Sequence, residues 1–342
     1  MPTTLIEPMA DGVIVAPRSN GTWNATLGLE GKDCWACAVD PADPAVIYVA
    51  SMEGLFRSGD AGRSWHRVGE DLPSQIFWSV AVSAVEKGSD GRGVVYAGTQ
   101  PTMLYRSEDG GKTWQDSPTI NDLPSKPTWK YPPKPSTHHL RCICPDPHQE
   151  GVLLIGVEQG GIMRSTDFGK TWRDRQPDGK GDAHTITTHP GAPHRIYVAA
   201  GDGYSESYDD GDTWKALDDG LPHRYLMGVS IDPADPDTIV TTNSKNWFRA
   251  HFPPFPSNTV YRKTRETDWT EVSDGLPKPL GQRNTGRVAT NPSEPHVFYF
   301  SENSGELYRS QDAGKTWERQ TVKWPAGYKN KQAHHLVIVD ID

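Results

Sequence analysis

The segment RSGDAGRSW, from Arg57 to Trp65, indicates the fold, because four other segments repeat its pattern. They read RSEDGGKTW from Arg106, RSTDFGKTW from Arg164, ESYDDGDTW from Glu206 and RSQDAGKTW from Arg309. The shared form is Ser-x-Asp-x-Gly-x-Ser/Thr-Trp. In such a stretch Asp can accept hydrogen bonds from backbone N–H groups of its own turn, Gly permits a positive φ, and Trp packs beneath the turn. The pattern therefore predicts five hairpin turns of one kind.

Two weaker copies complete the set: YRKTRETDW, which ends at Trp269, and APRSNGTW, which ends at Trp23. The seven tryptophans follow one another at intervals of 42 to 58 residues, and the first and last are 294 residues apart. The 48 residues outside that span match one more interval and are divided between the two ends of the chain. This spacing predicts seven repeating units, the last of them assembled from both termini.

These segments resemble the Asp-box repeats of bacterial neuraminidases, which lie on the outer hairpin of each β-propeller blade. The resemblance implies an all-β protein, a single seven-bladed β-propeller of four-stranded blades that spans residues 1–342 as one domain. Blade seven is expected to combine about residues 332–342 with residues 1–30, so that the C-terminal strand pairs with N-terminal strands and closes the ring. The composition agrees, since 33 glycines and 29 prolines suit a turn-rich β protein.

The net charge restricts the kinds of partner, and the N-terminus and the cysteines indicate the cellular compartment. A net charge of −9 argues against a nucleic acid or an anionic membrane as the main partner. The first residues, MPTTLIEPMADG, lack the features of a signal peptide, so we expect a cytoplasmic protein. Its four cysteines, Cys34, Cys37, Cys142 and Cys144, are then expected to be buried, reduced thiols rather than a disulfide framework.

The candidate site is expected on the face opposite the Asp boxes, where the central channel of a propeller opens. When the seven inner strands are aligned on the Pro-containing turns that follow them, one position reads Trp35, Trp78, His139, His184, Met227, Gly286 and His335. Neutral imidazoles from separate blades suit a divalent transition metal, Zn, Fe or Cu. We therefore predict His139, His184 and His335 as metal ligands, with His138 and His334 as further candidates. The alternative is that these histidines simply occupy a partly solvent-exposed channel mouth and that the protein binds no cofactor.

Carboxylates on the loops of the same face provide candidate acid–base groups. Glu53, Glu158, Asp202 and Glu302 lie between the second and third strands of their blades. Glycosidases need two carboxyl groups about 5 to 9.5 Å apart, and Glu158 with Asp202 is the best pair on neighbouring blades. The predicted catalytic set is Glu158, Asp202, His184 and Tyr204. The alternative for each carboxylate is a solvated loop charge.

Arginines and aromatic residues make up the predicted substrate-binding set. It comprises Trp35, Trp78, Arg141, Arg224, Arg287, Trp247 and Glu302, with Arg283 as another basic residue near the mouth. Two long insertions, residues 121–140 and 243–258, carry Trp129, Tyr131, Phe248 and Phe252. They are interpreted either as lids and stacking walls or as rigid covers of apolar surface.

Two classes of function remain open. The first is an enzyme that acts on a carbohydrate-like or small organic substrate by hydrolysis or elimination, with or without the metal. Similar repeats occur in xyloglucanases, which are about twice as long, and polysaccharide lyases use His, Tyr and Arg for elimination. The second is a non-catalytic, protein-binding propeller similar to the photosystem II assembly factors. The sequence has no Arg-Ile-Pro motif of sialidases, so sialidase activity is not expected.

Overall fold

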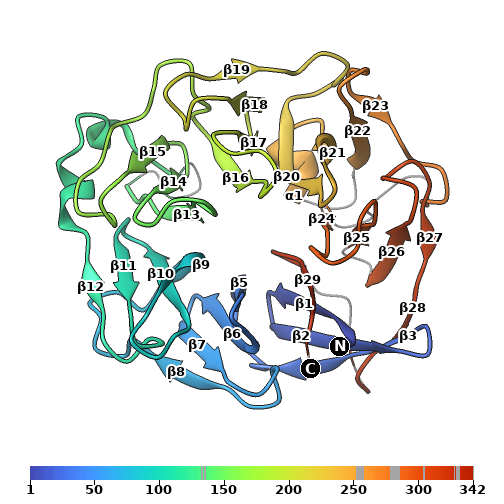
Figure 1. Cartoon of the computed structure of the whole chain (residues 1–342), viewed down its shortest axis with the longest axis horizontal. Coiled ribbons are helices and arrows are strands. Elements are labelled where there is room, and N and C mark those ends of the chain that lie inside the picture. The colour runs from blue at the N-terminus through green and yellow to red at the C-terminus, as the bar shows by residue number, and fades with distance from the viewer. Residues whose placement is uncertain are drawn as a thin grey trace.

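The computed structural model describes residues 1–131, 134, 136–251, 258–277, 286–302, 305–326, 328 and 332–341. These residues form seven β-sheets arranged in a ring, as Figure 1 shows. In the blades whose strands are consecutive in the chain, the first strand lies nearest the centre of the ring. The predicted all-β, seven-bladed propeller is confirmed.

Six blades follow one another along the chain. From the inner to the outer edge, the first blade contains β5 (Cys34–Asp40), β6 (Asp43–Ser51), β7 (Gly54–Ser58) and β8 (His66–Val68), and the second contains β9 (Phe77–Lys87), β10 (Gly93–Thr99), β11 (Leu104–Ser107) and β12 (Gln115–Asp116). The third blade contains β13 (Leu140–Pro145), β14 (Leu153–Val157) and β15 (Gly161–Ser165), and the fourth contains β16 (Ala183–Thr188), β17 (Ile196–Ala200), β18 (Gly203–Ser207) and β19 (Lys215–Ala216). The fifth blade contains β20 (Tyr225–Asp232), β21 (Asp235–Ser244), β22 (Asn258–Lys263) and β23 (Thr270–Glu271), and the sixth contains β24 (Arg287–Ala289), β25 (Phe298–Glu302), β26 (Glu306–Ser310) and β27 (Glu318–Arg319).

The third blade departs from the expected four strands. Among the described residues its sheet has three strands, and a single bridge between Arg164 and Arg173 takes the place of the outer strand. The chain between the second and third blades forms two 3-10 helices, Pro118–Asp122 and Lys126–Thr128. The insertion in the fifth blade contains α1 (Trp247–His251).

The seventh blade joins the two ends of the chain. Its strands are β1 (Thr3–Met9), β2 (Gly12–Ser19), β3 (Thr22–Asn24), β4 (Thr26–Gly28), β28 (Thr321–Lys323) and β29 (Val337–Asp340). β29 pairs with β1 on the inner edge, and Ile338 opposite Leu5 is almost fully buried. β28 pairs in parallel with β3 at the outer edge. The predicted closure by the C-terminal strand is confirmed, and a second contact, which the sequence did not reveal, holds the outer edge (Figure 1).

All five Asp-box turns contain the same hydrogen bonds. In the first, Ser58 Oγ donates to Asp60 and accepts from the backbone of Gly62, while Asp60 accepts from both the backbone and the hydroxyl of Ser64. Two successive residues, Ala61 and Gly62, have positive φ angles of 61° and 81°. The same four bonds recur in the boxes of Asp109, Asp167, Asp209 and Asp312. These local bonds explain why the turn recurs with so little sequence variation.

The hydrophobic core is divided among the junctions between blades. For example, Tyr48 and Leu55 of the first blade are fully buried against Val95 and Ala97 of the second. Seven such clusters alternate with the blades around the ring. Each blade is therefore stabilised by both neighbours, which makes closure of the ring important for the whole molecule. No helix within the described ranges is long and apolar enough to cross a membrane.

Candidate functional site

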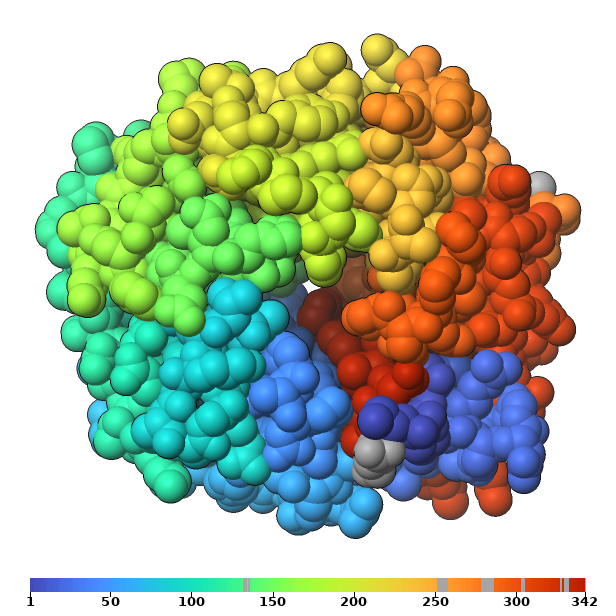
Figure 2. All heavy atoms as spheres, viewed as in Figure 1, coloured from blue at the N-terminus to red at the C-terminus, as the bar shows by residue number. Residues whose placement is uncertain are grey.

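The inner strands converge on a hollow at the centre of the ring, which Figure 2 shows in space-filling form. Among the described residues, a β-bulge interrupts the pairing of the inner strand within its first residues in five blades. The residues at the bulge are Trp35, Trp78, Arg141, His184 and Met227. Because Met9 pairs with Ala333 and Ile6 with Val337, His334 occupies the matching position of the seventh blade.

The alignment made from sequence was therefore wrong in two blades. It placed His139 in this position, two residues before Arg141, and His335, one residue after His334. In the third blade the alignment used Pro145, whereas Pro147 lies six residues after Arg141, as Pro41 lies six residues after Trp35. In the seventh blade no turn joins β29 to β1, because these strands lie at opposite ends of the chain. The other members of the column, Trp35, Trp78, His184 and Met227, are correctly placed.

Residues at the bulge positions contact one another around the channel mouth. The ring of His334 stacks on Trp35 with centroids 3.9 Å apart, and Trp35 contacts Trp78 at 4.2 Å. His139 stacks on Trp78 at 3.7 Å. The guanidinium of Arg141 lies 5.4 Å from the Trp35 ring and 6.0 Å from the Trp78 ring, within the range of cation–π attraction. These two tryptophans therefore hold protein side chains on their faces.

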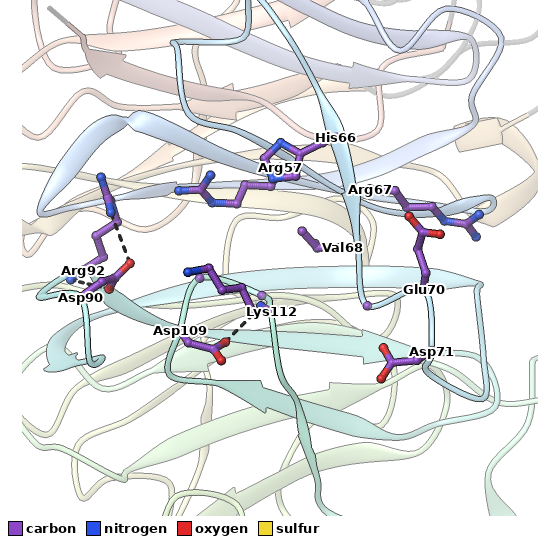
Figure 3. Close-up of a pocket in the computed structure, with 13 residues that line it drawn as sticks. Arg57, His66, Arg67, Val68, Glu70, Asp71, Asp90, Arg92, Asp109 and Lys112 are labelled. Carbon is purple, nitrogen blue, oxygen red and sulfur yellow. Dashed lines mark hydrogen bonds and ion pairs between the residues drawn. The ribbon is translucent and has the colours of Figure 1, made fainter.

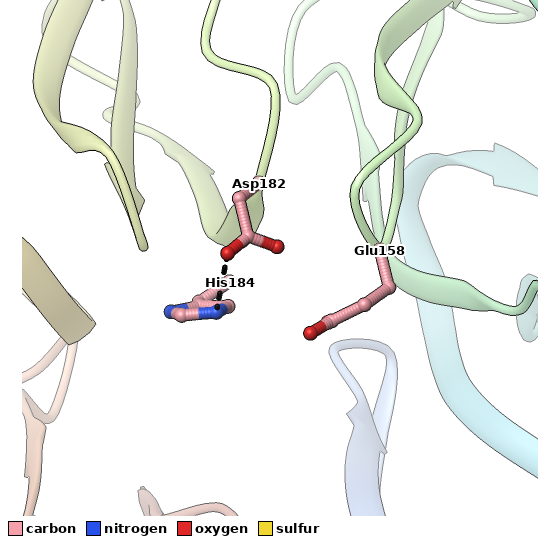
Figure 4. A group of neighbouring side chains, drawn as sticks. All are labelled: Glu158, Asp182 and His184. Atoms are coloured by element: carbon pink, nitrogen blue, oxygen red, sulfur yellow. Dashed lines mark ion pairs between the residues drawn. The ribbon is translucent and has the colours of Figure 1, made fainter. Parts of the chain in front are cut away.

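Two carboxyl groups and an imidazole meet beside this aromatic row. Glu158 follows β14, Asp182 directly precedes β16, and His184 is the second residue of β16. One ligand atom from each lies within 4.8 Å of the other two. Figure 4 shows Asp182 and His184 turned toward each other and Glu158 approaching from the neighbouring blade. The three residue types are those that bind divalent metals, and two nearby carboxyl groups are also the basis of acid–base catalysis.

Burial and mutual repulsion dominate the electrostatics of this cluster. Burial, then the charge of Asp182, raises the pKa of Glu158, while Arg141 opposes the rise with its Nε 3.6 Å from Glu158 Oε2. The pKa of Asp182 is also raised, mainly by burial, although the backbone N–H of Gln159 donates to it. Burial lowers the pKa of His184 to about 3, so its imidazole is neutral at physiological pH.

The predicted metal ligands are only partly brought together. His184 lies in the cluster, and Nε2 of His139 is 3.8 Å from Glu158 Oε2. His335 is not a member of this cluster, and its Nδ1 accepts a hydrogen bond from the backbone N–H of Cys37 at 3.3 Å. Nδ1 of His138 accepts from the backbone of Thr102, and Nε2 of His334 is 3.4 Å from Asp33 Oδ1. The set of His139, His184 and His335 is not assembled as one site.

The predicted catalytic set is also rearranged. Asp202 is exposed and accepts from the backbone of Gly181, and the nearer carboxylate to Glu158 is Asp182. Tyr204 is fully buried elsewhere, where its hydroxyl donates to Glu206 and its ring meets Trp269 edge-on. Sequence reasoning missed Asp182 because it considered only loops between the second and third strands, whereas Asp182 ends a linker between blades.

The remaining predicted binding residues lie at different depths. Arg287 is buried and donates from Nε to the carbonyl of His334, while Arg224 is largely exposed and 3.7 Å from Asp218. Glu302 is buried at the end of β25. Trp247 is exposed in α1 beside Phe248. Arg283 and Phe252 lie outside the described residues.

The first insertion contributes to the site directly. Tyr131 meets Trp78 and His139 edge-on, with centroids 5.8 and 4.9 Å away. Trp129 is buried and donates from Nε1 to Ser125 Oγ. The insertion therefore both covers apolar surface and places one tyrosine at the mouth.

A separate cavity of about 580 Å³ lies between the outer strands of the first blade and the Asp box of the second. Figure 3 shows that its lining is mostly charged, with Arg92 paired to Asp90. Asp109 is already used by the hydrogen bonds of its own turn. None of the predicted site residues lines this cavity, so the central cluster remains the candidate site.

Fold and site together define a seven-bladed, Asp-box-type propeller with a polar centre. Residues 135–342 match the DUF6242 beta propeller domain, so the chain belongs to that family. It is 25% identical over 316 residues to a xyloglucanase from a Paenibacillus species, which covers 76% of this chain and 29% of that protein. Over 274 residues it is 25% identical to the xyloglucanase Xgh74A of Acetivibrio thermocellus. The chain thus spans less than a third of the length of these relatives.

Two solved structures show the same fold. The GH74 enzyme of Niastella koreensis has a TM-score of 0.68 at 17% identity, covering 92% of this chain and 51% of that one. YCF48 bound to D1 peptide has a TM-score of 0.58 at 17% identity, covering 94% of this chain and 84% of that one. The chain is therefore a propeller distantly related in sequence to xyloglucanases, and it shares its fold with YCF48.

Proposed function

We propose that the channel mouth binds a saccharide and hydrolyses a glycosidic bond. The observation that carries this proposal is the pair of carboxyl groups, Glu158 and Asp182, from neighbouring blades at the centre of the ring. The distant sequence relationship to xyloglucanases supports a saccharide as the substrate.

The surroundings of the two carboxyl groups suggest different roles. The carboxyl of Glu158 accepts no hydrogen bond from the described residues, whereas Asp182 accepts the N–H of Gln159, which favours its charged form. We assign Glu158 as the proton donor to the leaving oxygen and Asp182 as the nucleophile. A separation within 4.8 Å is nearer to the roughly 5 Å of retaining enzymes than to the roughly 6.5–9.5 Å of inverting ones. Retention of anomeric configuration is therefore expected.

Hydrolysis of xyloglucan and β-glucan oligosaccharides tests the proposal. Glu158→Gln and Asp182→Asn should each lower kcat by about a hundredfold or more, since a positioned acid or base contributes on that scale. Asp202→Asn is the matched control, an exposed carboxylate on the same face, and should retain most activity. NMR of the first product should show the retained anomer. An inactive Asp202→Asn beside an active Asp182→Asn would exclude the assigned pair, and no hydrolysis of any oligosaccharide would exclude the reaction.

Peptide binding is the second candidate. The similarity of the fold to YCF48 bound to D1 peptide supports it, since that structure matches 94% of this chain with a TM-score of 0.58. Under this alternative the channel mouth binds a protein segment without catalysis. A peptide library should then yield a ligand whose binding Arg141→Gln weakens. Neither the wild type nor the Glu158→Gln and Asp182→Asn variants should hydrolyse an oligosaccharide.

A further inference from the structure

Three potential metal ligands at the channel mouth have the geometry of a cation site. Glu158, Asp182 and His184 each offer one atom within 4.8 Å of the others, and His184 Nε2 is 3.8 Å from Asp182 Oδ2. Zinc is held at about 2.0–2.2 Å by imidazole nitrogen and carboxylate oxygen. Small rotations of the two carboxyl groups would therefore bring all three atoms to a common ion.

The hydrogen bonding of His184 leaves the lone pair of Nε2 available to a metal in the cluster. Nδ1 lies 2.5 Å from the carbonyl oxygen of Leu226, so this nitrogen carries the proton and donates it. Nε2, with its lone pair, faces Asp182. Metal-binding histidines are commonly fixed in this way, because a hydrogen bond from the second nitrogen sets the tautomer and the ring orientation.

A second, independent observation comes from His139. Its side chain has no exposed surface, and neither ring nitrogen has a hydrogen-bond partner among the described residues. Nε2 lies 3.8 Å from Glu158 Oε2, on the side of the cluster. Buried polar groups are normally paired, so an imidazole in this state points to a ligand that satisfies it.

We propose that Glu158, Asp182 and His184 bind a divalent first-row transition ion, with His139 as a fourth ligand or as a partner of Glu158. Mixed imidazole and carboxylate ligands suit Zn²⁺ among these ions. The proposal goes beyond the proposed hydrolysis and does not require it. If both hold, a bound ion occupies the oxygen atoms that hydrolysis uses, so Zn²⁺ inhibits the reaction.

The position of Arg141 leads to a specific prediction for this metal site. Its Nε lies 3.6 Å from Glu158 Oε2, so its positive charge opposes a cation bound there. Arg141→Gln should therefore bind Zn²⁺ more tightly than the wild type. A surface site elsewhere on the molecule would not respond to this substitution.

Direct binding of Zn²⁺ to the full chain, purified without a histidine tag and treated with chelator, tests the proposal. Calorimetry should show one Zn²⁺ per chain, and His184→Ala and Glu158→Gln should each weaken binding more than tenfold. Replacing Zn²⁺ by Co²⁺ should give visible absorption bands that His184→Ala removes. Binding of less than one equivalent, or binding that His184→Ala leaves unchanged, would overturn the proposal.

Control variants distinguish loss of Zn²⁺ binding at this site from misfolding and from binding by other histidines. His194→Ala, on the exposed side chain paired with Asp210, and His335→Ala should leave Zn²⁺ binding unchanged. Asp182→Asn keeps the side-chain shape and should weaken binding while thermal unfolding shows an intact fold. Loss of binding in His335→Ala instead would overturn the ligand set. Since binding is measured without a substrate, the result stands whether or not the chain hydrolyses saccharides.

Discussion

Ser58 has no exposed surface and holds the first Asp-box turn together through a single oxygen atom. Ser58→Ala leaves the buried N–H of Gly62 without an acceptor and removes a bond to Asp60. The free energy of unfolding should fall by about 1–3 kcal/mol. Urea denaturation measures the difference.

Ser64→Ala in the same turn is the control, because Ser64 is exposed and water can replace its hydroxyl. Its effect should be clearly smaller. Equal losses in the two variants would show that burial of the Ser58 oxygen is not what makes this position important.

Glu7 in β1 gives the molecule a pH dependence. Burial raises its pKa to about 7, although the hydroxyl of Ser301 donates to it and Arg287 lies nearby. The folded state therefore binds this proton more tightly than the unfolded state, and stability falls as the pH rises from about 4.5 to 7. Glu7→Gln removes the charge, so its melting temperature should exceed that of the wild type increasingly between pH 5 and pH 8.

The expected difference in the free energy of unfolding at pH 8 is on the order of 3 kcal/mol. At pH 4 both proteins carry an uncharged side chain at this position and should unfold alike. Parallel melting curves across this pH range would contradict a raised pKa for Glu7.

Single residues also mark the limit of sequence reasoning. The Asp-box residues could be predicted because their partners lie two to four positions away in the chain. Asp182 and Glu158 could not be paired from sequence, since they come from different blades. Arg141 was placed at the mouth by its position near the inner strand, but its contact with both tryptophans depends on the bulge.

Strand β29 is the element on which closure depends. Deleting residues 335–342 removes its pairing with β1 and exposes the cluster around Leu5 and Met9. The truncated protein should melt at a clearly lower temperature. Val339→Ile, which keeps a β-branched apolar residue within the strand, should melt close to the wild type. A truncated protein as stable as the full chain would show that β28 at the outer edge is sufficient for closure.

The inner strands show how an element can be predicted and still be misread. Their existence and order follow from the repeat, and all seven are present. Their register also depends on a bulge, which adds one residue without any characteristic residue type. The error is confined to the third and seventh blades, where Arg141 and His334 occupy the bulge position in place of His139 and His335.

At the scale of the whole molecule, the ring brings distant segments to one place. The residues of the candidate site come from blades one, two, three, four and seven, with Arg287 from the sixth. The clusters between blades fix these positions, since each blade packs against two neighbours. A site of this kind depends on the closed ring more than on any single blade.

The number of blades, the Asp-box turns and the closure by the chain ends could all be predicted from the sequence. These features rest on contacts within a few residues or on a regular spacing, which a single chain displays directly. The three-dimensional structure was needed to show that Asp182, Glu158 and His184 meet, that Tyr204 lies in the core, and that β28 reinforces the ring. Such contacts depend on side-chain directions set by bulges and on the approach of separate blades, and neither is encoded in local sequence.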